Sequence, residues 1–231
     1  MRIKVYQINK DLDRHDASFI SYDSTLKAAG RVDSSIYKTV YDGDLECEGL
    51  EDVFQTLNGN EPPEYQGHSL SVSDVVEVCD ENTGVPKSSY FCDTIGFKKL
   101  EDFDTEKTEP LHGKKMVVVL PHKPAYEAIV GNGLEDLQRA VQGLIEITYP
   151  FDDNAAVIGN DEAKLIGMEG NRHIGMSIYA GPLLIAGDDG EGDLTDLTDE
   201  QVDRYKKMFA MPEDISDDEV QGDIGFRFFS F

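Results

Sequence analysis

The stretch LEDVFQTLNGNEPP, residues 50–63, contains a clear helical pattern. Its apolar residues recur at spacings of three and four, which places them on one face of a helix: Leu50, Val53, Phe54 and Leu57. An Asn-Gly pair then ends the helix, and two prolines follow as breakers. Strand patterns lie on both sides of this stretch, so it indicates a fold that mixes helices and strands.

The first half of the chain shows further strand patterns, in which apolar and polar residues alternate. We expect strands at residues 2–8, 19–22, 35–41, 67–78 and 90–97. Ser73 and Asp74 indicate a bend within the fourth of these.

The second half continues the mixture. We expect strands at residues 116–120, 126–130, 144–149, 155–158 and 179–186. Asn132 and Glu135 predict a capped helix, and Thr198 with Gln201 predicts a second capping box before a helix that ends at Phe209. Helices and strands interleave without a regular βαβ rhythm, which predicts an α+β fold of two small mixed sheet-and-helix domains.

Composition shifts suggest where these domains begin and end. The polar stretch around residues 104–113 is typical of a linker. We therefore expect one domain at residues 1–103, a second at residues 114–211, and a tail at residues 212–231 that is first acidic and then rich in Phe.

The chain is strongly acidic, with 46 Asp and Glu against 21 Lys and Arg in 231 residues, a formal charge of −25. Such a charge repels nucleic acid and anionic membranes, and it attracts basic protein surfaces. Solubility alone is the competing explanation. The charge is concentrated near the C-terminus, which predicts a partner-binding acidic face made of Asp188, Asp189, Glu191, Asp193, Asp196, Asp199, Asp214, Asp217, Asp218 and Glu219.

Two other segments are candidate binding sites. Asn171, Arg172 and His173 could hold a small anionic ligand, since Arg offers forked donors; the alternative is an Arg paired with a carboxylate. The C-terminal residues Phe226, Phe228, Phe229 and Phe231 could dock in a partner groove or close the fold as a strand.

Patterns typical of catalysis and metal binding do not emerge. His68 lies beside Ser69 outside any G-x-S-x-G motif, which favours a surface or capping role. The Cys and His residues lack zinc spacing, and glycines occupy the calcium-ligand positions counted from Asp188. We expect no cofactor, no metal and no enzymatic activity. The three well-separated cysteines, with no signal-peptide or membrane-span pattern, lead us to expect a reducing cytoplasm.

Two long stretches resemble known families. VYQI near the N-terminus, GHSLSVSDVV at residues 67–76 and DTIGF at residues 93–97 resemble the YodL-like domain of bacterial mobile-element and phage proteins. PHKPAYEAIVGNGLEDLQRAVQGLIEI at residues 121–147, with NRHIG and the acidic stretch after it, is similar to an uncharacterised domain of phage and conjugative elements. The resemblance implies a mobile-DNA product that acts in a bacterial cytoplasm. It supplies no catalytic residue.

These observations lead to three hypotheses. The first is a counter-defence inhibitor, an acidic DNA mimic that occupies the basic surface of a host nuclease or of a restriction or CRISPR-type enzyme. The second is sequestration of a nucleotide-like ligand near Arg172 without catalysis. The third is an adaptor that docks through its C-terminal tail.

Overall fold

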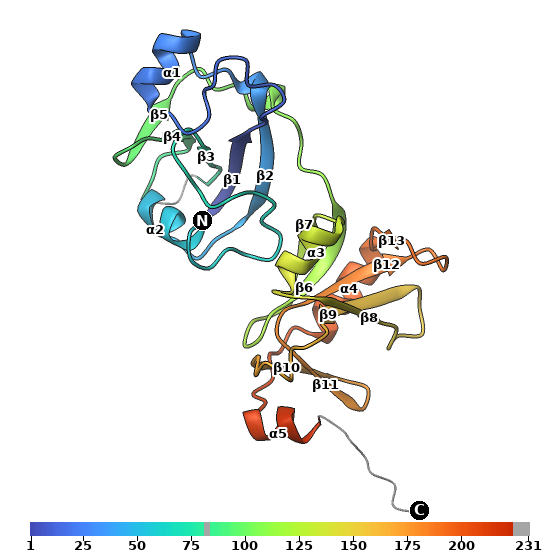
Figure 1. Ribbon diagram of the computed structural model, residues 1–231. Helices are drawn as coiled ribbons and strands as arrows, with labels where there is room; N and C mark the ends of the chain where they lie inside the picture. Colours follow the sequence, from blue (N-terminus) through green and yellow to red (C-terminus); the bar gives the residue numbers. More distant parts are fainter. Residues whose placement is uncertain (81–83, 224–231) are drawn as a thin grey trace, which may run out of the picture. The chain divides into compact units, whose positions relative to one another are not determined.

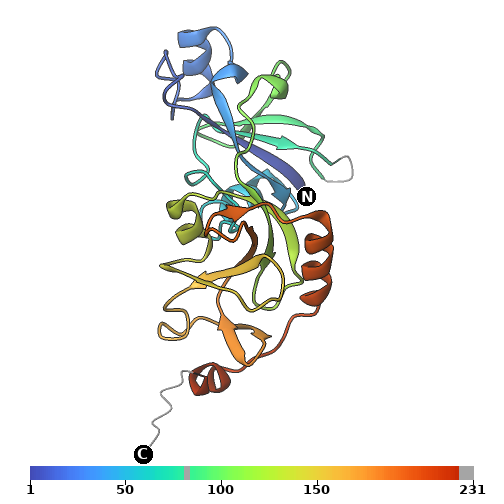
Figure 2. The same ribbon diagram turned by 90° about the vertical axis from the view of Figure 1, so that its right-hand side faces the viewer.

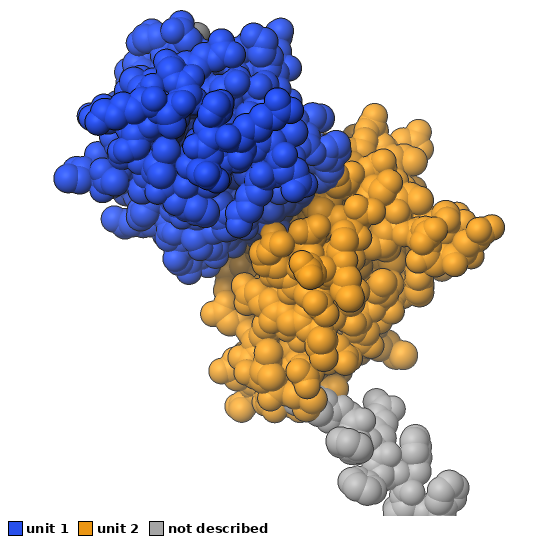
Figure 3. All heavy atoms as spheres, turned by 45° about the horizontal axis from the view of Figure 1, so that its top comes forward, with its two compact units in different colours: residues 1–112 blue, residues 113–231 orange. Residues whose placement is uncertain are grey.

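The computed structural model describes residues 1–80 and 84–223. The chain forms two compact units, Met1–His112 and Gly113–Phe231, which Figure 3 colours separately. The expected Phe-rich tail, with Phe226, Phe228, Phe229 and Phe231, lies outside the described residues. Each unit combines an antiparallel sheet with helices, which confirms the α+β fold class.

Unit 1 contains a five-stranded sheet in the order β2-β1-β3-β4-β5 (Figure 1). Its elements are β1 (Arg2–Ile8), α1 (Tyr22–Ala29), β2 (Tyr37–Asp44), α2 (Leu50–Thr56), β3 (Val75–Val78), β4 (Ser88–Cys92) and β5 (Phe97–Leu100), with 3-10 turns at Ser34–Ile36 and Thr105–Lys107.

Side chains alternate between the two faces of β1, and both faces are buried in a hydrophobic cluster. Ile3 and Val5 pack in one cluster with residues of α2, whereas Tyr6 and Ile8 pack in another. The helix predicted at residues 50–57 is present as α2, with Val53 and Leu57 buried as expected, whereas Phe54, predicted on the same face, is exposed.

Residues after β5 still belong to unit 1. The ring of Phe103 lies 5.4 Å from that of Tyr6 and 5.3 Å from that of Tyr37. The Glu109 amide donates to the Tyr37 carbonyl at 2.9 Å, and the Glu109 carbonyl accepts from the Thr39 amide at 2.8 Å. Much of the polar stretch at residues 104–113 is thus held against β2.

Unit 2 is built on a sheet in the order β7-β6-β12-β9-β8, with β13 paired to β12 and a separate β10–β11 hairpin. Its elements are β6 (Lys114–Val119), β7 (Tyr126–Val130), α3 (Leu134–Ala140), β8 (Ile145–Thr148), β9 (Ala155–Asn160), β10 (Gly170–Ile174), β11 (Ser177–Ala180), β12 (Leu183–Asp188), β13 (Leu194–Thr195), α4 (Asp199–Met208) and α5 (Asp217–Gly222).

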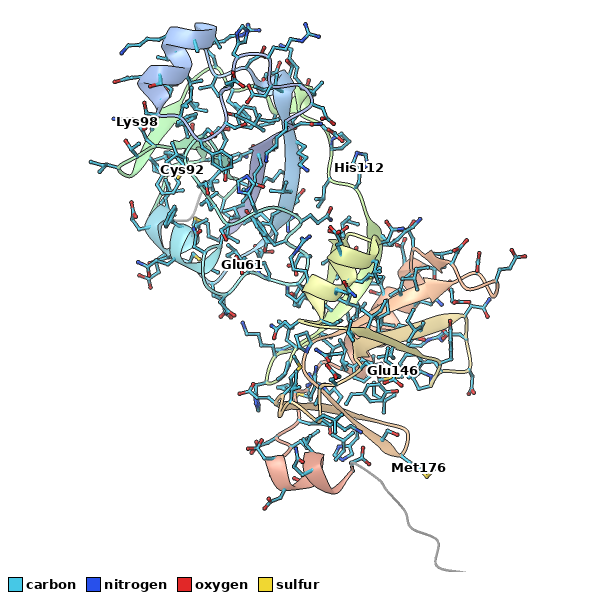
Figure 4. The ribbon with its side chains drawn as sticks, viewed as in Figure 1. Glu61, Cys92, Lys98, His112, Glu146 and Met176 are labelled. Atoms are coloured by element: carbon cyan, nitrogen blue, oxygen red, sulfur yellow. The ribbon has the colours of Figure 1, made fainter. Side chains whose placement is uncertain are left out.

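Helices cover both faces of this sheet as well (Figure 2). Met116 and Val118 of β6 pack with α3, and Val117 and Val119 pack with α4. A strand buried on both faces has no polar side, which explains the continuous apolar run MVVVL at residues 116–120. At the turn between β10 and β11, in contrast, Met176 is fully exposed (Figure 4).

Several expected elements differ from the structure. The strand expected at residues 19–22 is wrong, because Ser21 caps the N-terminus of α1 and Gly30 ends that helix in the left-handed region. The strand expected at residues 67–78 is shorter, because the backbone at Ser73 has a φ of 81° and pairing begins only at Val75.

Of the two helix caps predicted in unit 2, one is wrong and one is confirmed. The N-cap position of α3 is Gly133 and makes no side-chain hydrogen bond, so the expected Asn132 cap is wrong. The capping box of α4 is confirmed: Thr198 accepts from the Gln201 amide, and the Gln201 side chain accepts from the Thr198 amide.

Candidate functional site

The ten acidic residues predicted from the sequence fall into two groups within unit 2. One group runs from the end of β12 through the turn and β13 to the first residue of α4: Asp188, Asp189, Glu191, Asp193, Asp196 and Asp199. The other lies on and before α5: Asp214, Asp217, Asp218 and Glu219. The β12–β13 turn and α5 lie at opposite ends of unit 2 in both ribbon views (Figures 1 and 2), so the ten residues form two separate surfaces.

The first group, which we call the acidic hairpin (Asp188–Asp199), has a backbone fixed by its own carboxylates. Asp189 accepts hydrogen bonds from the amides of Glu191, Gly192 and Asp193 at 2.8–3.1 Å. These bonds hold the pKa of Asp189 below its usual value, and the bond from the Glu191 amide has the largest effect. The backbone of the turn is therefore held by local hydrogen bonds to one carboxylate.

Cations are scarce around the acidic hairpin. Lys115 pairs with Asp199, which raises the pKa of the lysine and lowers that of the aspartate, and its amide donates to Asp196 at 2.7 Å. Among the described residues, Glu191 and Asp193 are exposed and have no Lys or Arg within ion-pair distance. Their charge is left to solvent or to a partner.

Arg172 is buried, and its guanidinium is bonded chiefly to the backbone. Nη1 donates to the carbonyl and side-chain oxygens of Asn171 at 2.7 and 3.0 Å, and Nη2 donates to the carbonyls of Lys123 and Phe209 at 2.7 and 3.3 Å. Burial lowers the pKa of Arg172, with Glu213 opposing the shift. Only Nε lacks a partner within the described residues. The side chain thereby ties together three segments of unit 2.

The neighbours of Arg172 point in different directions. Asn171 is buried and donates to the carbonyls of Val119 and Gly181, whereas His173 is half exposed and lies 2.6 Å from a Glu213 oxygen. The pairing of β10 with β11 shifts register between Gly170 and Arg172, and this bulge allows two consecutive side chains to be buried. The structure does not bring the three predicted ligand-binding side chains together around a common space.

A cavity in unit 1 brings together residues far apart in the sequence. It has a volume of about 240 Å³, and its lining includes Gln7, His68 and Asp74. Gln7 Nε2 donates to Asp74 Oδ2 at 3.0 Å and to the His68 carbonyl at 2.8 Å, while its Oε1 accepts from the His68 amide at 3.1 Å. Gly67 has to be glycine here, because a Cβ would lie 2.5 Å from Gln7 Oε1. We call this the Asp74 cavity.

Asp74 is an unusual carboxyl group. Its side chain is 2% exposed, and the bonds from Gln7 and from the Ser71 amide both go to Oδ2. Burial raises the pKa of Asp74 to about 8, although those two hydrogen bonds oppose the shift. Oδ1 accepts no hydrogen bond within residues 1–80 and 84–223.

Two residues with strained backbones shape the cavity. Phe19 and Ser73 have φ values of 64° and 81°, a region that L side chains seldom adopt. The Phe19 amide donates to Ser73 Oγ at 2.9 Å, and the Ser73 carbonyl accepts from Tyr37 at 2.9 Å. Such strain persists where the surroundings fix it, often at functional sites. It places the exposed Phe19 ring 5.3 Å from that of His68.

Sequence patterns do not reveal this cavity. They predict a surface or capping role for His68 and only a bend at Ser73-Asp74. One usable signal is present: Asp74 directly precedes the apolar pair Val75 and Val76, and an acid that is buried beside such residues is uncommon without a partner.

The described residues do not meet the requirements of a metal site or of a membrane-spanning helix. In the described parts of the chain, three or more His, Cys, Asp or Glu side chains do not converge in a way that could hold a metal ion. The helices described here are all too short or too polar to cross a bilayer.

Comparison with known families assigns both halves of the chain. Residues 2–103 match the model of the YodL-like domain, and residues 114–210 match that of a domain of unknown function, DUF3846. The protein thus contains a YodL-like domain followed by a DUF3846 domain, with the Asp74 cavity in the first and the acidic hairpin in the second. Neither the curated proteins nor the solved structures gave a match.

Proposed function

We propose that this chain is a non-enzymatic binding protein whose acidic hairpin docks on a basic protein surface that would otherwise hold nucleic acid. The observation that supports this most is the charge density of the hairpin and the start of α4. Residues 188–203 contain eight Asp and Glu and no Lys or Arg. A surface of this kind attracts basic partners and speeds their encounter.

The order of the hairpin also supports the proposal. Asp189 fixes the turn by accepting three amide hydrogen bonds, so Glu191 and Asp193 are presented from a defined backbone. Ordering a loop on binding reduces affinity, and a turn that is ordered beforehand avoids most of that loss.

The class of partner follows from the same chemistry. Duplex DNA has one negative charge per ~1.7 Å of axis, so a competitor for its binding surface needs closely spaced negative charge. Combined with the resemblance to mobile-element and phage proteins, this makes a host nuclease, or a restriction or CRISPR-type enzyme, our proposed target. The protein would act as a counter-defence inhibitor in the bacterial cytoplasm.

A charge-neutralised variant tests the proposal. In E191Q/D193N/D196N, the carboxamide introduced at position 196 retains a side-chain oxygen that can accept from the Lys115 amide, so the local fold is kept. The matched control D16N/E48Q/D102N removes three exposed acids from unit 1. Both are compared with the native chain as bait in a bacterial lysate at low and high salt.

We expect the native chain and the control to capture a nucleic-acid-binding protein at low salt only, and the hairpin variant to lose it. Restoration of nuclease activity by high salt would be the matching functional readout. Equal capture by all three chains, or capture that salt does not weaken, would contradict the proposal.

The two other hypotheses stay predictions. Sequestration of a ligand at Arg172 is less favoured, because four acceptors already occupy its terminal nitrogens. The adaptor hypothesis concerns Phe226, Phe228, Phe229 and Phe231, and deletion of residues 224–231 tests it: lost binding with retained solubility supports docking.

A further inference from the structure

The Asp74 cavity has features of a small-ligand site that are independent of the acidic hairpin. Its floor is polar: Asp74 presents an oxygen without a hydrogen bond, and His68 Nδ1 lies 2.8 Å from the Ser69 carbonyl. A bond to that carbonyl needs the ring proton on Nδ1, whereas the contact of Gln7 Nε2 with Nδ1 at 3.2 Å needs a bare Nδ1, so Nε2 can meet a ligand as acceptor or as donor. Asp74 Oδ1 is reached by solvent from the cavity, so a donor group of a ligand can replace water there.

One wall of the cavity is aromatic. The Phe19 ring is 53% exposed, although it is a large apolar group, and its position depends on a strained backbone fixed by Ser73. A planar ring that enters the cavity can stack on such a side chain, an interaction that nucleobases make readily.

The lining also includes two cations. Lys10 and Lys38 belong to it, and within the described residues neither has a carboxylate at ion-pair distance. This is unexpected because residues 1–112 contain 23 Asp and Glu. Unpaired ammonium groups suit a phosphate, although Asp11 also lies in the lining and limits how much negative charge is tolerated.

We propose that the Asp74 cavity binds a nucleoside monophosphate, with the base against the exposed side of Phe19 and within reach of Asp74, and the phosphate at Lys10 and Lys38. The volume of about 240 Å³ accommodates a base but not a whole nucleotide, so the sugar and phosphate lie toward the solvent. A polynucleotide is disfavoured, because the net charge of unit 1 is negative.

The test uses the full chain, titrated calorimetrically with AMP, GMP, CMP and UMP, their nucleosides, and inorganic phosphate. We expect one or more monophosphates to bind saturably at one site, nucleosides about tenfold more weakly, and phosphate more weakly still. Thermal stabilisation by the same ligands gives an independent readout.

Two double variants separate the cavity from general charge. K10A/K38A changes exposed lysines, so folding is retained. We expect it to lower the affinity for the monophosphate at least about tenfold. K27A/K98A removes two other exposed lysines of unit 1, including Lys98 on β5 (Figure 4), and should leave binding unchanged. D74N, which retains the shape of the side chain, should shift the preference among the bases.

Three results would overturn the proposal. One is the absence of binding for every monophosphate up to about 10 mM. Another is equal affinity of the native chain and K10A/K38A. The third is that inorganic phosphate binds as tightly as any nucleotide, which would show that the base contributes nothing to binding.

Discussion

Two deeply buried ionisable side chains, Asp74 in unit 1 and Arg172 in unit 2, differ in how completely they are hydrogen-bonded. Arg172 in the DUF3846 domain donates to four oxygens contributed by three segments. Asp74 in the YodL-like domain receives two hydrogen bonds on one oxygen, has no cation bonded to it within the described residues, and lines a cavity. Nearly complete hydrogen bonding indicates a structural role for the arginine, whereas the incompletely bonded carboxyl indicates a binding site.

The same contrast explains why a sequence motif can mislead. Asn171-Arg172-His173 has the composition of an anion site, yet its arginine is used to hold the chain together. Ser73-Asp74 has the composition of a turn, yet the structure places this carboxyl in a cavity.

Removal of Arg172 should have the largest effect on stability. In R172M the carbonyls of Lys123 and Phe209 lose their bonds from Nη2, although Phe209 still accepts from the Ala125 amide, and we expect the free energy of unfolding of unit 2 to fall by about 3–5 kcal/mol. The chain has no Trp, so hydrogen-exchange mass spectrometry is the suitable readout, with protection lost in peptides of residues 113–223 and retained in residues 1–80. Unchanged protection would show that these bonds contribute little.

Replacement of Asp74 should change how stability depends on pH. The unfolded chain ionises this carboxyl at pH ~4, whereas the folded chain retains the proton up to about pH 8. Between these values the unfolded state loses its proton first, so native stability falls as pH rises. D74N removes this loss, and from pH 5 to 8 we expect the native chain to lose about 3–4 kcal/mol relative to it.

This difference isolates Asp74 because the other titratable groups of the cavity, Asp11, His68, Lys10 and Lys38, are common to both chains. Denaturant unfolding at several pH values measures it. Parallel stability curves for the two chains would mean that the Asp74 pKa is ordinary and that its burial has no energetic consequence.

The smallest effect is expected at an exposed arginine. Arg204 donates to Asp153 at 2.7 Å with its side chain about half in solvent, and such surface pairs contribute about 0–1 kcal/mol. R204M is thus the control for R172M, since the substitution is the same, whereas Arg204 is half exposed and pairs with a carboxylate and Arg172 is buried and bonds mainly to backbone carbonyls. A loss as large as that of R172M would mean that exposure does not separate the two sites.

Local patterns are sufficient to predict part of the fold. The spacing of Leu50, Val53 and Leu57 gives the buried face of α2, and Thr198 with Gln201 gives the start of α4, because both depend on neighbours within one or two helical turns. The helix α1 is not predicted by such patterns, because Thr25 is its one buried residue and its sequence therefore has no apolar stripe.

The candidate sites depend on longer-range contacts. Gln7 lies 61 residues from His68 and 67 from Asp74 in the sequence, and the antiparallel pairing of β1 with β3 brings it to them. The partners of Arg172 are backbone carbonyls, which have no signature in a sequence. The acidic residues are visible in the sequence, but their separation into two surfaces follows from where α5 lies in unit 2.

The central claim, that the acidic hairpin binds a basic protein surface, is tested most directly by the salt dependence of binding to the captured partner. We expect affinity of the native chain to fall steeply between low and physiological salt, and the E191Q/D193N/D196N variant to bind more weakly with a clearly shallower salt dependence. Identical affinities and identical salt dependences for the two chains would contradict the account.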